Sequence, residues 1–187
     1  MYYQKSIEDY LNREIEVIKH LDVDAINAAM NAIKDAWERE ATIYTMGNGG
    51  SASTASHMVC DFNKGVSENI GKQKYHLQCL SDNTATMMAI ANDVAYDDIF
   101  KFQLEGNVKP GDLIIAISGS GNSENVIRAV RYAKEQGAKV IGMSGYSGGK
   151  LNELSDYPLH VDINDMQIAE DVHLIFNHMM MQILSQM

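Results

Sequence analysis

Cysteine is scarce in this chain of 187 residues, and Cys60 and Cys79 are the only two. Two cysteines in a chain of this length do not make a disulfide framework, so the sequence favours a reducing compartment. The N-terminal stretch, residues 1–9, is polar and lacks the apolar core of a signal peptide. We therefore expect a cytoplasmic protein.

Long apolar runs and a surplus of positive charge are lacking as well. No apolar run approaches the roughly 20 residues of a membrane-spanning helix. Lys and Arg together number 15 against 25 Asp and Glu, which gives a formal net charge of -10 at pH 7. The basic residues are scattered singly, and a surface this acidic repels nucleic acids and anionic membranes. We expect neither nucleic acid nor membrane as a partner.

Hydrophobic residues make up 45% of the chain, which is enough to fill a packed core. The length suits one compact domain, and because no linker or repeat interrupts it we expect a single domain over 1–187. The first forty residues predict two helices, one capped by Ser6 and running to His20, the next capped by Asp24. Their apolar stripes must be buried against the sheet of this chain or against a neighbouring subunit.

From Ala41 onward, short apolar runs rich in β-branched residues alternate with helical stretches. This alternation predicts an α/β fold with a mostly parallel sheet covered by helices on both faces. The run at 113–117 is apolar throughout, as expected of a central strand. The strand candidates are 41–46, 75–80, 113–117, 140–144 and 159–163, and the last helix runs from about Gln167 to the end of the sequence.

Two loops rich in glycine and serine each follow a predicted strand and open a helix. The first is Gly47-Asn48-Gly49-Gly50-Ser51, and the second is Ser118-Gly119-Ser120-Gly121-Asn122-Ser123. In a parallel sheet, ligands bind beyond the carboxyl ends of the strands, where helix N-termini offer free N–H groups and a positive dipole. Glycines let a ligand approach the backbone, and serine hydroxyls add donors.

Ordinary turns with capping serines are the alternative explanation for these loops. Three serines in the second loop exceed what one helix cap needs. The second loop lacks the Lys-Ser/Thr ending of a nucleotide P-loop, and the first lacks the glycine spacing of a dinucleotide fingerprint. The loops together predict a site for a phosphate ester that carries no nucleotide.

Ionisable residues gather on the helix after the first loop and on the last helix. His57 and Asp61 are four residues apart and share a face, while the last helix carries Glu170, His173 and His178. His173 and His178 are five residues apart and cannot both face one site. Such a set can hold a divalent metal, act as an acid/base pair, or form surface pairs without chemistry.

Taken together, these motifs resemble the sugar isomerase (SIS) domain family and, within it, the phosphoheptose isomerase branch. The resemblance covers nearly the whole chain. It rests on the two loops, on His57 six residues after the first, on 91–93 followed by 98–100, on 144–145 with 148–150, and on His173 with His178. It implies a three-layer αβα sandwich with a flavodoxin-like parallel five-stranded sheet, assembled as a homotetramer with active sites at subunit interfaces.

The same resemblance implies an activity: the conversion of sedoheptulose 7-phosphate to glycero-manno-heptose 7-phosphate through an enediol, toward heptoses of lipopolysaccharide or capsule. It also implies roles for individual residues. Asp61 and His178 are expected to be the acid/base pair. The residues expected around a divalent metal, zinc in some relatives, are His57, Asp61, Glu170 and His178. The residues expected to contact the substrate are Asn48, Gly49, Gly50, Ser51, Asp93, Ser118, Gly119, Ser120, Ser123, Gln167 and Glu170.

Four positions depart from the family pattern. Asp61 stands where Glu is usual, Glu170 where Gln is usual, Gly65 where Arg is usual, and Gln167 where Asp is usual. The expected sugar contacts are thus altered while the phosphate contacts are kept, so an isomerase of a related phosphosugar is an alternative. Another is a non-catalytic SIS protein, either of the replication-initiator-binding type or a sugar-phosphate sensor. The acid at 61 and the retained histidines favour an enzyme.

Overall fold

Five parallel strands form the centre of the computed structural model, which describes residues 2–71 and 73–186. The strands are β1 (Ile43–Gly47), β2 (Leu77–Cys79), β3 (Leu113–Ser118), β4 (Lys139–Ser144) and β5 (Tyr157–His160). All five lie where the sequence predicts a strand. The last is shifted from the predicted 159–163: it begins at Tyr157 and ends at His160, where its partner β4 ends at the facing residue Ser144.

The sheet order is β2-β1-β3-β4-β5, which is the flavodoxin-like order. The central strand β3 is buried along its whole length, as its apolar sequence predicts. Because β1 lies between β2 and β3, the chain leaves β1 toward one side of the sheet and later returns to its other side. The carboxyl ends of β1 and β3 therefore flank the point where the strand order reverses, which is where open α/β sheets bind ligands.

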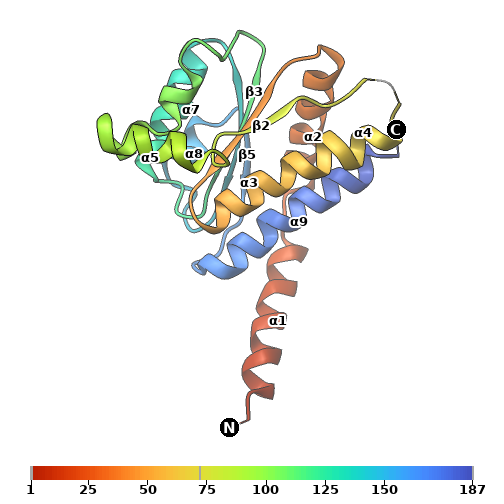
Figure 1. Ribbon diagram of the computed structural model, residues 1–187. Helices are drawn as coiled ribbons and strands as arrows, with labels where there is room; N and C mark the ends of the chain where they lie inside the picture. The colour runs from red at the N-terminus through yellow and green to blue at the C-terminus, as the bar shows by residue number, and fades with distance from the viewer. Residues whose placement is uncertain (1, 72, 187) are drawn as a thin grey trace.

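Helices cover both faces of the sheet, which gives the predicted three layers (Figure 1). The helices of one face are α2 (Val23–Glu38), α3 (Gly50–Cys60), the π-helical turn η1 (Asp61–Val66) and α9 (Met166–Leu184). The other face carries α5 (Thr84–Asp93), α6 (Lys101–Leu104), α7 (Glu124–Glu135) and α8 (Gly149–Leu154). The remaining short elements are α4 (Ser67–Asn69) and η2 (Tyr96–Asp98).

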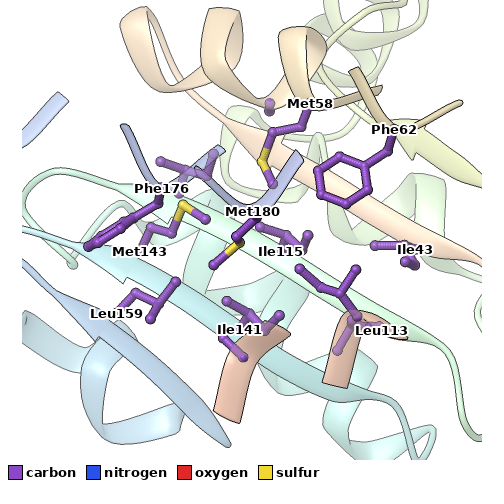
Figure 2. Packing of buried hydrophobic residues seen from close by; sticks show 14 of the residues in the cluster. Ile43, Met58, Phe62, Leu113, Ile115, Ile141, Met143, Leu159, Phe176 and Met180 are labelled. Carbon is purple, nitrogen blue, oxygen red and sulfur yellow. The ribbon is translucent and has the colours of Figure 1, made fainter. Parts of the chain in front are cut away.

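Alternate residues of β3 divide between the two layers of core. Leu113, Ile115 and Ile117 pack under α3 and α9, whereas Ile114 and Ala116 face the helices of the opposite side. Figure 2 shows the first cluster, in which side chains from α3, η1 and α9 meet the strands. This packing fixes α3 and α9 side by side on one face of the sheet (Figure 1).

The two N-terminal helices begin earlier than the sequence predicts. The first, α1, runs over Gln4–Lys19, so Ser6 lies inside it rather than capping it. The second is capped by Asp22, not Asp24, because Asp22 has an extended backbone and its carboxylate accepts a hydrogen bond from the backbone N–H of Ala25 at 2.9 Å. Asp24 lies in the first turn of the helix, where the positive end of the helix dipole stabilises its carboxylate.

The two N-terminal helices differ in how they pack. Helix α2 buries Ile26, Ala29, Ile33 and Ala36 against the sheet. Helix α1 projects from the body (Figure 1), and within the described chain it has no buried residue. It carries an exposed apolar stripe of Ile7, Leu11, Ile15 and Ile18.

Among the described residues, two polar contacts join α1 to the first part of α9. Tyr10 Oη donates to Asp171 Oδ2 at 2.5 Å, and Arg13 pairs with Asp165 at 2.9 Å. The hydrogen bond to Asp171 raises the pKa of Tyr10 to about 12. Over the described residues, every helix is too short or too polar to cross a membrane.

Candidate active site

The two Gly/Ser loops leave the sheet from adjacent strands. Gly47, the last residue of β1, pairs with Ile117 near the end of β3. Each loop then opens a helix, α3 after the first and α7 after the second. The loops thus flank the switch point of the sheet, and both helix N-termini begin there.

The second loop is a tight turn enclosed by backbone. The N–H of Gly121 donates to the carbonyl of Ser118 at 2.9 Å, and the carbonyl of Gly121 accepts from Leu151 N–H at 2.9 Å. Gly121 has φ +65°, and a Cβ there would collide with the carbonyl oxygen of Gly148. Only glycine fits this position without displacing the loop.

The serine hydroxyls of this loop do not cap the helix that follows it. Ser123 is the N-cap residue of α7, yet its hydroxyl accepts from no backbone N–H of that helix in the described structure. It lies instead 3.1 Å from the hydroxyl of Ser118, while Ser120 Oγ accepts from Asn122 N–H at 3.2 Å. Three hydroxyls therefore surround the start of a twelve-residue helix. This arrangement favours an anion over a plain turn.

In the first loop, Asn48 is held by a network of amides. Its side chain exchanges two hydrogen bonds with the buried Asn125, at 2.9 and 3.0 Å, and accepts a third from Tyr96 Oη at 3.1 Å. Gly49, with φ +55°, is the N-cap residue of α3, and Ser51 is buried in its first turn. The side chain of Asn48 is thus fixed, and the loop leads into the backbone N–H groups at the start of α3.

Three ionisable side chains meet where α3 passes α9. His57 Nε2 lies 3.4 Å from Asp61 Oδ2, and His178 Nε2 lies 3.8 Å from the same oxygen. One ligand atom from each residue can be chosen so that all lie within 4.8 Å of one another. The side chains of His57 and His178 are 45% and 53% exposed and that of Asp61 is 15% exposed, so the cluster is open to solvent. His178 also borders a hollow of about 620 Å³ over the end of α9.

Glu170 does not belong to this group: among the described residues, only His57, Asp61 and His178 lie close enough together to share a metal ion. Its carboxylate covers Gly50, where a Cβ would collide with it, so it lies against the first loop. Asp93, exposed at the end of α5, accepts from Asn92, and the backbone N–H of the exposed Gln167 donates to Asp165. Neither of those contacts reaches another predicted site residue.

His173 is separated from His178, as the spacing predicts. It is fully buried beside Phe176, and its ring nitrogens have no hydrogen-bond partner of ordinary geometry among the described residues. Burial lowers the pKa of His173 to about 4, an effect that the backbone of Ser144 partly offsets. The ring is therefore neutral near pH 7 and belongs to the core.

Asn177 is a site residue that the sequence analysis did not select. It is fully buried on α9, and its Nδ2 donates to Asp61 Oδ2 at 2.6 Å. The available signal was its place in the buried stripe of α9, which is otherwise apolar except for His173. A second unforeseen feature is that α3 widens into the π-helical turn η1 at Asp61. Such turns are frequent at functional sites.

The SIS domain family matches this chain over residues 3–145. The phosphoheptose isomerase of Aliarcobacter butzleri is 34% identical over 185 residues, which cover 95% of this chain and 94% of that protein. The phosphoheptose isomerase of Mycobacterium tuberculosis is 34% identical over 156 residues, which cover 83% and 79%.

Among solved structures, the phosphoheptose isomerases of Neisseria gonorrhoeae and Francisella tularensis both superpose with a TM-score of 0.90, at 27% and 26% identity. Each alignment covers 100% of both chains. The parallel sheet, the loops at its switch point and these similarities agree. The chain belongs to the SIS domain family, in its phosphoheptose isomerase branch.

Proposed function

We propose that the protein is an aldose–ketose isomerase that converts sedoheptulose 7-phosphate to D-glycero-D-manno-heptose 7-phosphate. The observation that carries the proposal is the convergence of His57 from α3, Asp61 from η1 and His178 from α9, where α3 starts from one of the two switch-point loops. A phosphate site alone would serve a sensor equally well. Two imidazoles around a carboxylate add groups that can move protons.

The phosphate is assigned to the second loop. Ser118, Ser120 and Ser123 supply hydroxyl donors, and the N-terminus of α7 supplies free N–H groups and the positive end of its dipole. Asn48, fixed by Asn125, is assigned to the sugar hydroxyls together with Asp93. His57 lies seven residues after Gly50, roughly 10 Å along α3 at 1.5 Å per residue. This separation from the first loop supports the assignment of the proton-moving groups to an end of the sugar away from the loops.

Isomerisation moves the carbonyl from C2 to C1 without net loss or gain of atoms. A base removes one proton from C1, the electron pair forms the C1–C2 double bond, and the C2 oxygen gains a proton to give the enediol. Return of a proton to C2 with loss of the C1 hydroxyl proton yields the aldose. We assign these transfers to Asp61 and His178, whose reacting atoms lie 3.8 Å apart and exchange roles between the two halves.

The donor set fits a divalent metal. Two imidazole nitrogens and one carboxylate oxygen are ligands that zinc accepts, and three protein ligands leave a position for substrate. Bound there, such an ion would polarise the two substrate oxygens and favour the enediolate charge. His57, Asp61 and His178 would hold it, and Glu170, which reaches the first loop from α9, is proposed as a substrate contact or a fourth ligand.

The proposal includes a homotetramer in the cytoplasm. The stripe of Ile7, Leu11, Ile15 and Ile18 is exposed in the described chain, although Tyr10 and Val17 of the same helix pack against the core. The cluster around Asp61 is open, so a neighbouring subunit is proposed to close the site. Cys60 and Cys79 are both free, in keeping with a reducing compartment.

Incubation with sedoheptulose 7-phosphate, with and without added Zn²⁺, tests the activity by detection of the aldose phosphate. A panel of other ketose phosphates tests the altered sugar contacts at Gly65 and Gln167. Turnover of a different member of the panel would reassign the substrate. Tight binding without any product would instead support a sensor.

The role of His178 is tested by the variant His178→Gln, which removes the proposed proton-transfer group and leaves both loops unchanged. It should abolish isomerisation, by at least about 100-fold for a lost acid/base group, while binding of the phosphate ester changes little. Retained turnover would remove His178 from the mechanism.

A further inference from the structure

The buried side of Asp61 is contacted by an amide. Asn177 Nδ2 lies 2.6 Å from Asp61 Oδ2, which is shorter than the distances from that oxygen to His57 and His178. Asn177 is fully buried, whereas both imidazoles are about half exposed. Asp61 therefore lies between an amide on the core side and two imidazoles on the solvent side.

The orientation of this amide is set by its partner. An ionised carboxylate only accepts hydrogen bonds, so the NH₂ group of Asn177 must face Asp61. Among residues 2–71 and 73–186, Asn177 Oδ1 has no hydrogen-bond partner. An amide at this position is unfavourable for the core unless its one hydrogen bond serves the site. On either side of it, Phe176 and Met180 occupy the same buried stripe with apolar side chains.

We propose that Asn177 is a positioning residue that fixes the carboxylate of Asp61 for proton transfer and metal binding. This inference rests on the proposed function of the cluster. Asp61 is one methylene shorter than the Glu usual at this position, and its oxygen must still reach both imidazoles. The amide occupies one lone pair of Oδ2 on the core side and leaves the other directed at His57 and His178. Ligating carboxylates depend on such outer contacts for orientation.

The test is the variant Asn177→Ala, with Val172→Ala as a matched truncation in the buried stripe of the same helix. Asn177→Ala should lower kcat at least about tenfold with KM nearly unchanged, because a mispositioned group loses rate rather than substrate contacts. Titration of the metal-free protein with Co²⁺, followed by absorption, should show affinity weakened about tenfold. Val172→Ala should lower thermal stability and keep both kcat and Co²⁺ affinity.

A second substitution that restores activity would distinguish a positioning role of Asn177 from a packing role. Adding Asp61→Glu to Asn177→Ala lengthens the side chain by one methylene, so that the carboxylate can reach both imidazoles without the amide, and kcat should recover in part. Should Asn177→Ala not fold, Asn177→Thr fills more of the space and carries a hydroxyl too short to reach Oδ2, with the same losses expected.

Unchanged kcat and Co²⁺ affinity in the Asn177 variants, or equal losses in Val172→Ala, would overturn the inference. A wild-type protein without isomerase activity would refute the proposed function instead. The Co²⁺ titration would then still decide whether Asn177 orients Asp61.

Discussion

The buried imidazole of His173 makes the stability of the fold depend on pH. Its pKa is about 4 in the folded chain, against 6.5 for the ordinary group. Because the folded pKa is the lower one, the unfolded chain takes up a proton that the folded chain refuses. The free energy of unfolding is therefore undiminished above about pH 6.5, falls as the pH drops from 6.5 toward 4, and levels off below 4.

The size of the effect follows from these two pKa values. Each unit of pKa difference corresponds to 1.36 kcal/mol, so complete passage through the window removes about 3 kcal/mol. Between pH 7 and pH 5, where most of the window has been crossed, the loss is about 2 kcal/mol. Losses of this size are measurable against a total stability of about 5–15 kcal/mol.

Urea unfolding at pH 7 and at pH 5 measures this loss in the wild type and in His173→Leu. Each protein is compared with itself at the two pH values, so the packing cost of the new leucine cancels. The variant should lose about 2 kcal/mol less than the wild type between the two pH values. His76→Leu makes the same exchange at an exposed histidine and should retain the wild-type pH dependence. An identical pH dependence in the wild type and His173→Leu would refute the assignment of the effect to this ring.

Two further predictions concern the phosphate loop and the N-terminal helix. Gly121→Ala and Gly106→Ala both place a side chain at positive φ, which costs roughly 1–2 kcal/mol, but only at Gly121 would the Cβ meet backbone. Gly121→Ala should therefore weaken the binding of inorganic phosphate by at least about tenfold, whereas Gly106→Ala should not. Calorimetry that finds equal phosphate affinity in the two variants would argue against this loop as the phosphate site. Ile15→Asp, on the apolar stripe of α1, should dissociate the proposed tetramer in light scattering after gel filtration, whereas Ser6→Asp adds the same charge on the opposite face and should leave it assembled. A monomeric wild type would contradict this prediction.

The sheet and both loops could be predicted because their signals are local. Apolar runs of strand length mark the five strands, and the glycines and serines follow two of them directly. Helix starts were less predictable, since Asp22 and Asp24 are both able to cap and only the backbone conformation at Asp22 selects between them. The end of β5 depends on where its partner β4 ends, and the sequence of β5 alone does not carry that information.

The candidate site was predictable only in part. Helical spacing joins His57 to Asp61, but His178 is more than one hundred residues away, and only the family resemblance brought it to the same place. Asn177 had no motif to mark it, and its role depends on a contact between two helices. The π-helical turn at Asp61 inserts an extra residue into the helical repeat, which no simple periodicity predicts.

Helix α9 joins parts of the molecule that are far apart in sequence. Its first turns hold α1 through Asp165 and Asp171, and its later turns carry His178 toward Asp61. Nineteen helical residues span roughly 28 Å, so one helix connects these two regions. The contacts that hold α1 and the histidine that faces Asp61 are therefore carried by one continuous helix, so a change in the position of α9 would affect both.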